Sequence, residues 1–358
     1  MVGTSDVVSL GIAAFNEERH VGETLESIRV QTHRDLEVHI FDNASTDATG
    51  AICRPFLSDG RFHYHRNAVN IGAVRNFNRV HAVARGDFVV PMSANDILEP
   101  TYLERLLEVM RRDPANGLVA ARMSLIDDAS QPVPQDEWLP QRVFETDCAD
   151  PVRAAATVMR SWHYPNYFFG MYRRSVMERL QPQRFLYGGD VAFVCELALY
   201  ANIRFVDATL IHIRRHGRPQ VGHLVRAFSE DVLYGTRPGS IFSRFDLVMP
   251  FVDFTWAYLE MIALAGIADE QKGILSRIAI STQRRLHGRQ MRAEVAALLR
   301  VGEKNEGLWS RPANLLQRCL LARRLLDRVS RAFIVYPDES ALADLCRRLA
   351  AALAPPPA

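Results

Sequence analysis

Several features that would place this chain in particular protein classes are missing from its sequence. The five cysteines are odd in number and none shows Cys-x-x-Cys spacing, which argues against a disulfide framework and against a zinc ribbon. The 43 Lys and Arg residues nearly balance the 41 Asp and Glu residues, so the chain lacks the overall positive field of a nucleic-acid-binding protein. A signal peptide is not expected either, because no basic segment precedes an apolar stretch and a small-residue cleavage site at the N-terminus. These absences predict a cytoplasmic protein that does not bind nucleic acid.

The composition is that of a folded protein with a full hydrophobic core. The length of 358 residues and the 48% of hydrophobic residues fit about two domains. Gly217-Arg218-Pro219 and Arg237-Pro238-Gly239 interrupt the pattern between residues 216 and 245. We therefore predict a first domain over residues 1–220 and a helical region over residues 221–358.

The end of the chain differs in charge from the rest. From Glu270 onward there are 16 Lys and Arg residues against 8 Asp and Glu residues, and arginine pairs punctuate stretches rich in Leu and Ala. Such a surface suits a peripheral contact with an anionic membrane, a contact with a second copy of the chain, or plain exposure to solvent. The sequence leaves these three readings open.

Strands, polar turns and helices alternate over the first hundred residues. The expected strands cover 7–14, 36–41, 61–65 and 88–92, and the expected helices cover 21–28, 48–57 and 73–84. This alternation implies a parallel sheet with right-handed crossovers. The loops that follow the strands should then meet at one edge of the sheet, where open α/β sheets bind ligands.

Four polar segments occupy these loops. They are Phe15-Asn16-Glu17, Asp42-Asn43-Ala44-Ser45-Thr46-Asp47, Asn70-Ile71-Gly72 and Ser93-Ala94-Asn95-Asp96. In order and spacing they resemble the Tyr-Asn-Glu, Asp-Asp/Asn-x-Ser-x-Asp, Asn-x-Gly and Asp-x-Asp motifs of family-2 inverting glycosyltransferases. The segment 169–176 resembles the acceptor-side segment of that family, and Gly189-Asp190 stands in the place of its Glu-Asp pair. The resemblance covers about residues 5 to 220.

The resemblance implies an α/β fold of the GT-A type. Its sheet would be Rossmann-like and mostly parallel with helices on both faces, and a helical C-terminal region would follow. The residues implied at the nucleotide and donor are Ala14, Phe15, Asn16, Glu17, Asp42, Asn70, Gly72, Arg75, Asn95 and Asp96. Asp42 would accept hydrogen bonds from the base or ribose, Asn70 and Gly72 would offer backbone amides, and Arg75 would reach a phosphate. On local grounds alone, Asp42 is equally well a turn residue or a helix cap, and Arg75 is a solvated side chain. Asn16 is expected to cap the helix that follows it.

A divalent cation, Mg²⁺ or Mn²⁺, is expected at the diphosphate. Ser93 and Asn95 stand where the family has acids, so Asp96 is the only carboxylate of its segment. His216 would be a second ligand, and Arg214 and Arg215 would add positive charge at the diphosphate. We expect this metal to bind weakly, or only in the nucleotide complex, because both ions prefer several hard oxygen ligands.

The resemblance also assigns the remaining catalytic parts. Asp190, expected to be exposed in a loop before a helix, would be the general base that takes the proton of an acceptor hydroxyl, although helix capping alone would explain it. Trp162, Tyr167, Phe169 and Gly170 would face the acceptor, unless the aromatic cluster is ordinary core.

The sequence thus predicts a glycosyltransferase that uses a nucleoside-diphosphate sugar and inverts the anomeric carbon in a single displacement. The alternative is a non-catalytic or regulatory nucleotide-sugar-binding protein with an eroded metal segment. A nucleotidyltransferase is disfavoured, because the loop after the first strand lacks the Gly-rich, Lys- or Arg-bearing pattern of that class.

Overall fold

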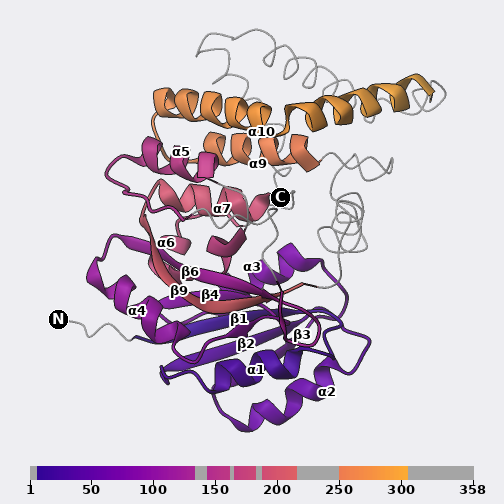
Figure 1. Ribbon diagram of the computed structural model, residues 1–358, viewed down its shortest axis with the longest axis vertical. Coiled ribbons are helices and arrows are strands. Elements are labelled where there is room, and N and C mark those ends of the chain that lie inside the picture. The colour runs from indigo at the N-terminus through magenta and orange to yellow at the C-terminus, as the bar shows by residue number, and fades with distance from the viewer. Residues whose placement is uncertain (1–5, 134–142, 162–164, 183–187, 216–249, 305–358) are drawn as a thin grey trace, which may run out of the picture. The chain divides into compact units, whose positions relative to one another are not determined.

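The computed structural model describes residues 6–133, 143–161, 165–182, 188–215 and 250–304 (Figure 1). The strands are β1 Val8–Ala14, β2 Leu36–Asp42, β3 Phe62–Arg66, β4 Phe88–Ser93, β5 Ile97–Leu98, β6 Asn116–Ile126, β7 Pro132–Val133, β8 Met171–Arg173 and β9 Asn202–Arg214. The helices are α1 Val21–Arg29, α2 Thr49–Cys53, η1 Arg54–Ser58, α3 Ala73–Val83, α4 Tyr102–Arg112, α5 Pro151–Ser161, η2 Pro165–Phe169, α6 Arg174–Met177, α7 Gly189–Ala198, α9 Pro250–Leu264 and α10 Asp269–Lys304.

The centre of the sheet consists of parallel strands that end at the same level. β1 pairs with β2 on one side and with β4 on the other. In this register Ala14 lies beside Asp42, and Ala13 lies beside Ser93. The loops after these three strands therefore leave the sheet together at one edge, as the sequence predicts.

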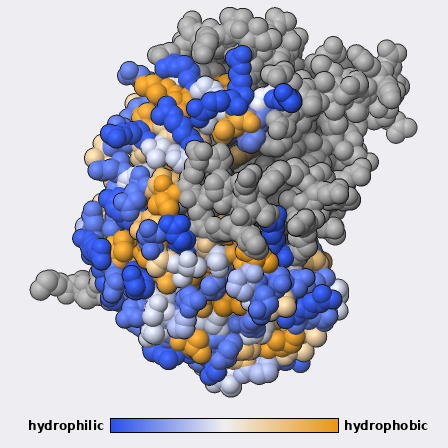
Figure 2. Space-filling model, viewed as in Figure 1, coloured by the Kyte–Doolittle hydropathy of each residue, from blue (hydrophilic) through white to orange (hydrophobic). Residues whose placement is uncertain are grey.

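Helices cover both faces of this sheet. Successive residues of a strand point to opposite faces, and Leu10 of β1 belongs to one buried cluster with Leu25 of α1 and Leu106 of α4. Gly11 points to the other face, where a Cβ atom would lie 2.0 Å from Cγ1 of Val80 in α3. Only a residue without a side chain lets α3 approach β1 this closely. On the face seen in Figure 2, the described hydrophobic residues are scattered among hydrophilic ones.

The α/β class is confirmed, but only half of the sheet is parallel. The strand order is β3-β2-β1-β4-β8-β6-β9-β5, with β7 paired to β6. β8 is antiparallel to both β4 and β6, and β5 is antiparallel to β9, whereas β6 and β9 are parallel. The expectation of a mostly parallel sheet thus holds for β3-β2-β1-β4, whereas beyond β4, among the described strands, only β6 and β9 pair in parallel. The regular strand–turn–helix repeat stops after β4, and antiparallel strands need no crossover helix.

One predicted helix is interrupted. The helix expected over residues 48–57 is the single-turn α2 followed by the 3-10 turn η1. Pro55 lies near the start of η1 and has no N–H to continue the α-helical ladder, and its ring conflicts with the carbonyl four residues earlier. The other expected elements of the first hundred residues match the observed ones to within about two residues, the usual margin at element ends.

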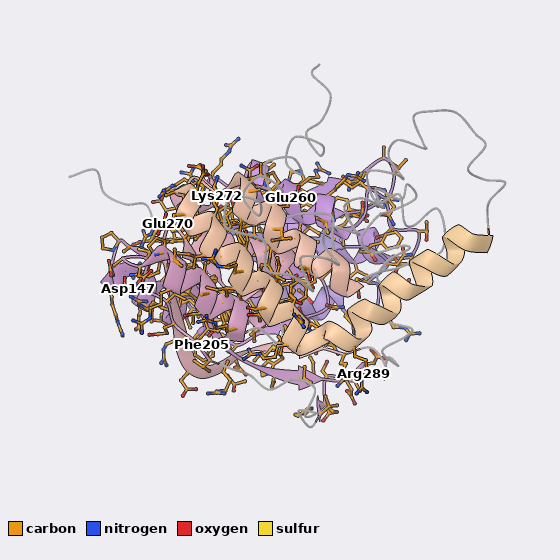
Figure 3. All side chains as sticks on the ribbon, turned by 90° about the horizontal axis from the view of Figure 1, so that it is seen from above. Asp147, Phe205, Glu260, Glu270, Lys272 and Arg289 are labelled. Atoms are coloured by element: carbon orange, nitrogen blue, oxygen red, sulfur yellow. The ribbon has the colours of Figure 1, made fainter. Side chains whose placement is uncertain are left out.

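Beyond β9 the described chain is helical, which confirms the predicted C-terminal helices. α9 and α10 lie side by side (Figure 3) and pack on each other, and Nζ of Lys272 donates to the carbonyl oxygen of Ala263 at 3.1 Å. These two helices form a compact unit separate from the sheet and its helices. The predicted boundary at residue 220 lies outside the described residues. Within the described ranges, no helix has the length and apolar character needed to cross a bilayer.

Candidate functional site at the edge of the sheet

The loops after β1 and β2 are joined by hydrogen bonds in both directions. The backbone N–H of Asn16 donates to Oγ of Ser45 at 2.9 Å, and Oδ1 of Asn16 accepts the backbone N–H of Thr46 at 2.8 Å. Asn16 has a φ of 54°, in the left-handed region that asparagine tolerates better than most residues. The prediction that Asn16 caps the first helix is wrong, because its side chain fixes this turn and α1 begins only at Val21.

Asp42 ends β2 and is completely buried. Its Oδ1 accepts the backbone N–H of Ser45 at 2.8 Å, while Oδ2 accepts the hydroxyl of Tyr64 and, at 2.5 Å, Nη1 of Arg66. Burial alone would raise the pKa of Asp42, but the hydrogen bonds from Ser45 and Tyr64 and the charge of Arg66 lower it below the ordinary aspartate value. Asp42 is thus an ionised carboxylate surrounded by protein groups, and its contact with a base or ribose stays a prediction.

Tyr64 and Arg66 come from the edge strand β3, and the sequence reasoning did not select them. β3 is parallel to β2, with Arg66 beside Asp42 and Tyr64 beside Ile40. Residues two apart in a strand share a face, so both side chains lie on the face of Asp42. The sequence signal for them is their spacing of two residues, with Tyr64 inside the strand expected over residues 61–65 and Arg66 one position beyond it.

Four asparagines fix the loop between β3 and α3. Oδ1 of Asn43 accepts Nδ2 of Asn67 at 2.9 Å, and the same Nδ2 donates to Oδ1 of Asn76 at 3.1 Å. Nδ2 of Asn43 donates to Oδ1 of Asn70 at 2.7 Å, which also accepts the backbone N–H of Gly72 at 2.8 Å. Gly72 has a φ of 83°, a conformation that suits glycine. The Gly72 amide is therefore bonded to Asn70 rather than offered to a nucleotide as expected.

Asp96 lies directly after β4 with only 2% of its surface exposed. Its Oδ1 accepts the backbone N–H of Arg214 at 2.9 Å. Burial raises the pKa of Asp96 to about 7, the charge of Glu17 raises it as well, and the hydrogen bond and charge of Arg214 oppose both. Oε1 of Glu17 accepts Nδ2 of Asn95 at 3.2 Å. Glu17, Asn95 and Asp96, which the sequence placed in two separate motifs, therefore form one cluster.

The side chain of Arg214 does not point toward a diphosphate as expected. It is fully buried at the end of β9, and Nε donates to the carbonyl oxygen of Asn95 at 2.9 Å. Nη1 donates to the carbonyl oxygen of Asp127 at 2.6 Å, and Nη2 donates to Oε2 of Glu23 at 2.7 Å. All three nitrogens are thus used inside the protein, where Arg214 joins α1 to the loops after β4 and β6.

The other predicted cations and ligands have different surroundings. Arg75 is exposed in the first turn of α3, and its Nη1 donates to the carbonyl oxygen of Ile71 at 3.3 Å. Arg215 is half-buried, with its backbone N–H bonded to the carbonyl oxygen of Ile126 at 2.9 Å. His216 and Trp162 lie outside the described residues.

A divalent cation finds only part of a coordination shell here. No group of three or more His, Cys, Asp or Glu side chains suited to a metal ion occurs among the residues described. Asp96 contributes one carboxylate with one oxygen already hydrogen-bonded, and the carboxylate of Glu17 is close enough to raise the pKa of Asp96. Because Mg²⁺ and Mn²⁺ prefer several hard oxygens, these residues fit such an ion only when a diphosphate supplies the remaining ligands.

Asp190 lies in the first turn of α7 and is half-buried, not exposed as predicted. Burial raises the pKa of Asp190 to about 6, although the backbone N–H groups of Val191 and of Asp190 itself lower it. The pKa of Tyr172 in β8 is raised mainly by burial and further by the negative charge of Asp190. Asp190 therefore lies near β8, which is part of the predicted acceptor segment 169–176.

Two predicted acceptor residues belong to the protein interior. Tyr167 is 1% exposed and stacks on Phe144 at 4.1 Å between ring centroids, and its hydroxyl donates to the carbonyl oxygen of Phe144 at 2.7 Å. Gly170 is buried, and a Cβ atom there would lie 2.6 Å from the carbonyl oxygen of Val119. Phe169 is half-buried. Of these described residues, Phe169 alone keeps a partly exposed side chain for an acceptor.

Comparison with known proteins points to one class of enzyme. Residues 9–180 match the model of Glycosyl transferase family 2. An uncharacterized glycosyltransferase from Nostoc sp. is 25% identical over 217 residues, which are 59% of this chain and 65% of that protein. Abequosyltransferase RfbV from Salmonella typhimurium is 34% identical over 130 residues, which are 32% of this chain and 39% of that protein. In both cases the chain spans less than two thirds of the relative's own length.

Solved structures show the same fold. The crystal structure of S. aureus TarS residues 1–349 in complex with UDP-GlcNAc gives a TM-score of 0.54 at 16% identity, covering 78% of this chain and 72% of that one. The complex of the same protein with UDP gives a TM-score of 0.53 at 15% identity, over the same shares of both chains. The fold is thus the GT-A type, and residues 9–180 are similar to family-2 glycosyltransferases.

Proposed function

We propose that this chain moves a sugar from a nucleoside diphosphate to a hydroxyl of an acceptor, with inversion at the anomeric carbon. The observation that carries the proposal is the meeting of three motif-bearing loops, after β1, β2 and β4, at one edge of a GT-A sheet. The match of residues 9–180 to Glycosyl transferase family 2 covers the same loops. The nucleotide would lie over this edge and the acceptor beside β8 and the start of α7.

The reaction needs one proton acceptor and one counter-charge. The acceptor oxygen forms a bond to the anomeric carbon while the bond from that carbon to the diphosphate oxygen breaks, and the acceptor proton passes to the carboxylate of Asp190. Attack opposite the leaving group inverts the anomeric configuration. A pKa of about 6 leaves Asp190 mostly ionised at neutral pH and still basic enough to take a proton.

The leaving diphosphate carries negative charge that the site has to balance. A divalent cation, when bound, supplies that charge, and Asp96 and His216 would hold it together with diphosphate oxygens. Arg75 is exposed at the start of α3 and would contact a phosphate. Arg214 would keep the loop of Asp96 in place through its bond to Asn95.

The proposal is tested by donor binding and donor turnover. UDP-, GDP-, dTDP- and CDP-sugars are added with and without Mn²⁺, and one class of donor is expected to raise the melting temperature, because a ligand of the native state stabilises it. Free nucleoside diphosphate should then be released slowly with water as acceptor, and NMR should find the released sugar with inverted anomeric configuration. Retention of the anomeric configuration would rule out a single-displacement mechanism.

The same assay distinguishes the glycosyltransferase from the alternative, a nucleotide-sugar-binding protein without catalysis. A donor that raises the melting temperature and is never turned over, with any hydroxyl acceptor, would indicate a nucleotide-sugar-binding protein without catalysis. No stabilisation by any donor would contradict the proposed function as a whole. Asp190→Asn is the matched variant, since it should keep donor binding and lose turnover.

A further inference from the structure

Arg66 presents a fixed guanidinium group at the surface of the predicted donor site. Nη1 donates to Oδ2 of Asp42 at 2.5 Å, and Nη2 donates to the carbonyl oxygen of Ser45 at 2.7 Å. A guanidinium carries five N–H donors, and the Arg66 side chain is 49% exposed. The two bonds therefore fix its plane, while about half of the side chain stays accessible to a ligand.

The position of Arg66 follows from the register of three strands. Ala14 of β1, Asp42 of β2 and Arg66 of β3 are neighbours in one row at the carboxyl ends of their strands. Phe15, the next residue after Ala14, is 41% exposed. Since adjacent strands lie about 5 Å apart, the ends of β1 and β3 are separated by roughly 10 Å. A single planar base fits that width.

The support of the guanidinium is buried and rigid. Asp42 is 0% exposed and is itself held by Ser45 and by the hydroxyl of Tyr64. A Cβ atom on Gly50 would lie 2.7 Å from the Tyr64 hydroxyl, so α2 packs closely over this pair. Arg66 is thus oriented before any ligand arrives, which lowers the entropy cost of binding.

We propose, as an extension of the proposed function, that Arg66 selects the nucleobase of the donor and that this base is uracil or guanine. Arginine donates hydrogen bonds and accepts none. Uracil offers carbonyl oxygens, and guanine offers O6 and N7, whereas cytosine and adenine place an amino group at the corresponding position. Asp42 is then a positioning residue that acts through Arg66, rather than a direct contact of the base.

Isothermal titration of the full chain with UDP, GDP, CDP and ADP tests the proposal, with inorganic pyrophosphate as a probe without a base. The wild-type protein should bind UDP or GDP at least about tenfold tighter than CDP and ADP, and Arg66→Gln should weaken the favoured nucleotide by roughly 10- to 100-fold, the range for a hydrogen bond to a charged group. Pyrophosphate affinity should not change. Arg61→Gln is the matched control, because Arg61 precedes the same strand and pairs with Asp59.

Arg66→Lys keeps a cation beside Asp42 and removes the planar fork. It should melt within a few degrees of wild type and still lose the preference for UDP or GDP over CDP and ADP. Equal losses for nucleotide and pyrophosphate would overturn the proposal in favour of a phosphate contact, and so would a preference for CDP or ADP or an effect below threefold. If the wild-type protein bound no nucleoside diphosphate, the proposed function itself would fail. If the wild-type protein bound a nucleoside diphosphate and both Arg66 variants kept its selectivity, only the role of Arg66 would be contradicted.

Discussion

The carboxylate of Asp190 is half-buried and lies beside β8. If Asp190 is the general base, its removal should lower the rate and leave donor binding intact. Asp190→Asn should leave the donor dissociation constant unchanged and lower kcat by roughly 10² to 10⁴, the usual effect of losing a general base. The wild-type rate should rise with pH through about 6, because Asp190 must be ionised to take a proton. The variant should lack that rise.

Measurement of kcat and donor affinity across pH 5 to 8 checks this expectation. Asp207→Asn is the matched control, since Asp207 is largely exposed and paired with Arg122 on the surface. A rate within about threefold of wild type in Asp190→Asn, against the 10² or more expected of a general base, would remove Asp190 from the reaction.

Asp96 has a folded-state pKa of about 7 against an ordinary value of 3.8. Below the ordinary value Asp96 is neutral in both the folded and the unfolded chain. As the pH rises toward 7 the unfolded chain ionises first, so the contribution of Asp96 to stability is lost progressively. Asp96→Asn removes this cost and keeps an oxygen that accepts the backbone N–H of Arg214.

We compare the melting temperature of Asp96→Asn with that of the wild type, both in EDTA. The difference, variant minus wild type, should therefore be larger at pH 8 than at pH 4.5. Scanning calorimetry at the two values measures it. The same difference at both pH values would mean that burial does not raise the pKa of Asp96.

At the scale of elements, Arg214 joins α1 to the loops after β4 and β6. Arg214→Ala removes a fully buried guanidinium and leaves several partly buried acceptors without their donor, so it should destabilise the protein by about 3 kcal/mol. Much of this loss should come from the carbonyl oxygens, since Glu23 is half-exposed. Arg122→Ala, which removes an exposed ion pair, should change stability by less than about 1 kcal/mol. Urea unfolding measures the free energy of unfolding of both variants. Equal losses of stability would mean that Arg214 does not hold these elements together.

The contact between β1 and α3 gives a second expectation for packing. Gly11→Ala puts a methyl group onto Val80, and overpacking of this kind costs about 1 to 3 kcal/mol. Gly60→Ala is the control, because a Cβ atom there meets nothing within 4 Å. A Gly11→Ala protein as stable as Gly60→Ala would mean that α3 moves away from β1 at no cost.

The sequence predicted the elements whose pattern is local. β1 and β4 are mainly apolar, β2 alternates apolar residues with Glu37 and His39, and polar turns follow all three strands. Their parallel order follows from the helices between them. Roles that depend on distant partners could not be predicted this way. Arg214 is buried because it meets Glu23, 191 positions earlier in the chain. Tyr167 is core because Phe144 stacks on it.

At the scale of the whole molecule, the described helices α9 and α10 form a unit separate from the sheet. We propose that the division near residue 220 separates a donor-binding domain from a helical region that melts independently. Calorimetry should then find two transitions, and a saturating nucleotide should raise the temperature of one by several degrees, because only the unit that binds is stabilised. A single transition that moves as a whole would contradict the division.

The expected binding of a divalent metal depends on the complex of the protein with its nucleotide. Mn²⁺ should bind weakly to the nucleotide-free protein and much more tightly once UDP or GDP is present, because the described protein ligands supply too few oxygens. Titration of Mn²⁺ with and without nucleotide measures this difference. Tight binding to the nucleotide-free chain would contradict it, and full activity in EDTA would remove the metal from the reaction.

The crossed hydrogen bonds between Asn16, Ser45 and Thr46 have a consequence for protein engineering. Glu17 adds to them, with its backbone N–H bonded to Oγ1 of Thr49 at 2.8 Å. A loop transplanted from a relative after β1 alone would leave the donors and acceptors of its partner loop unmatched, and the same holds after β2. Donor preference should therefore transfer between relatives only as a two-loop cassette, residues 15–18 together with 43–49.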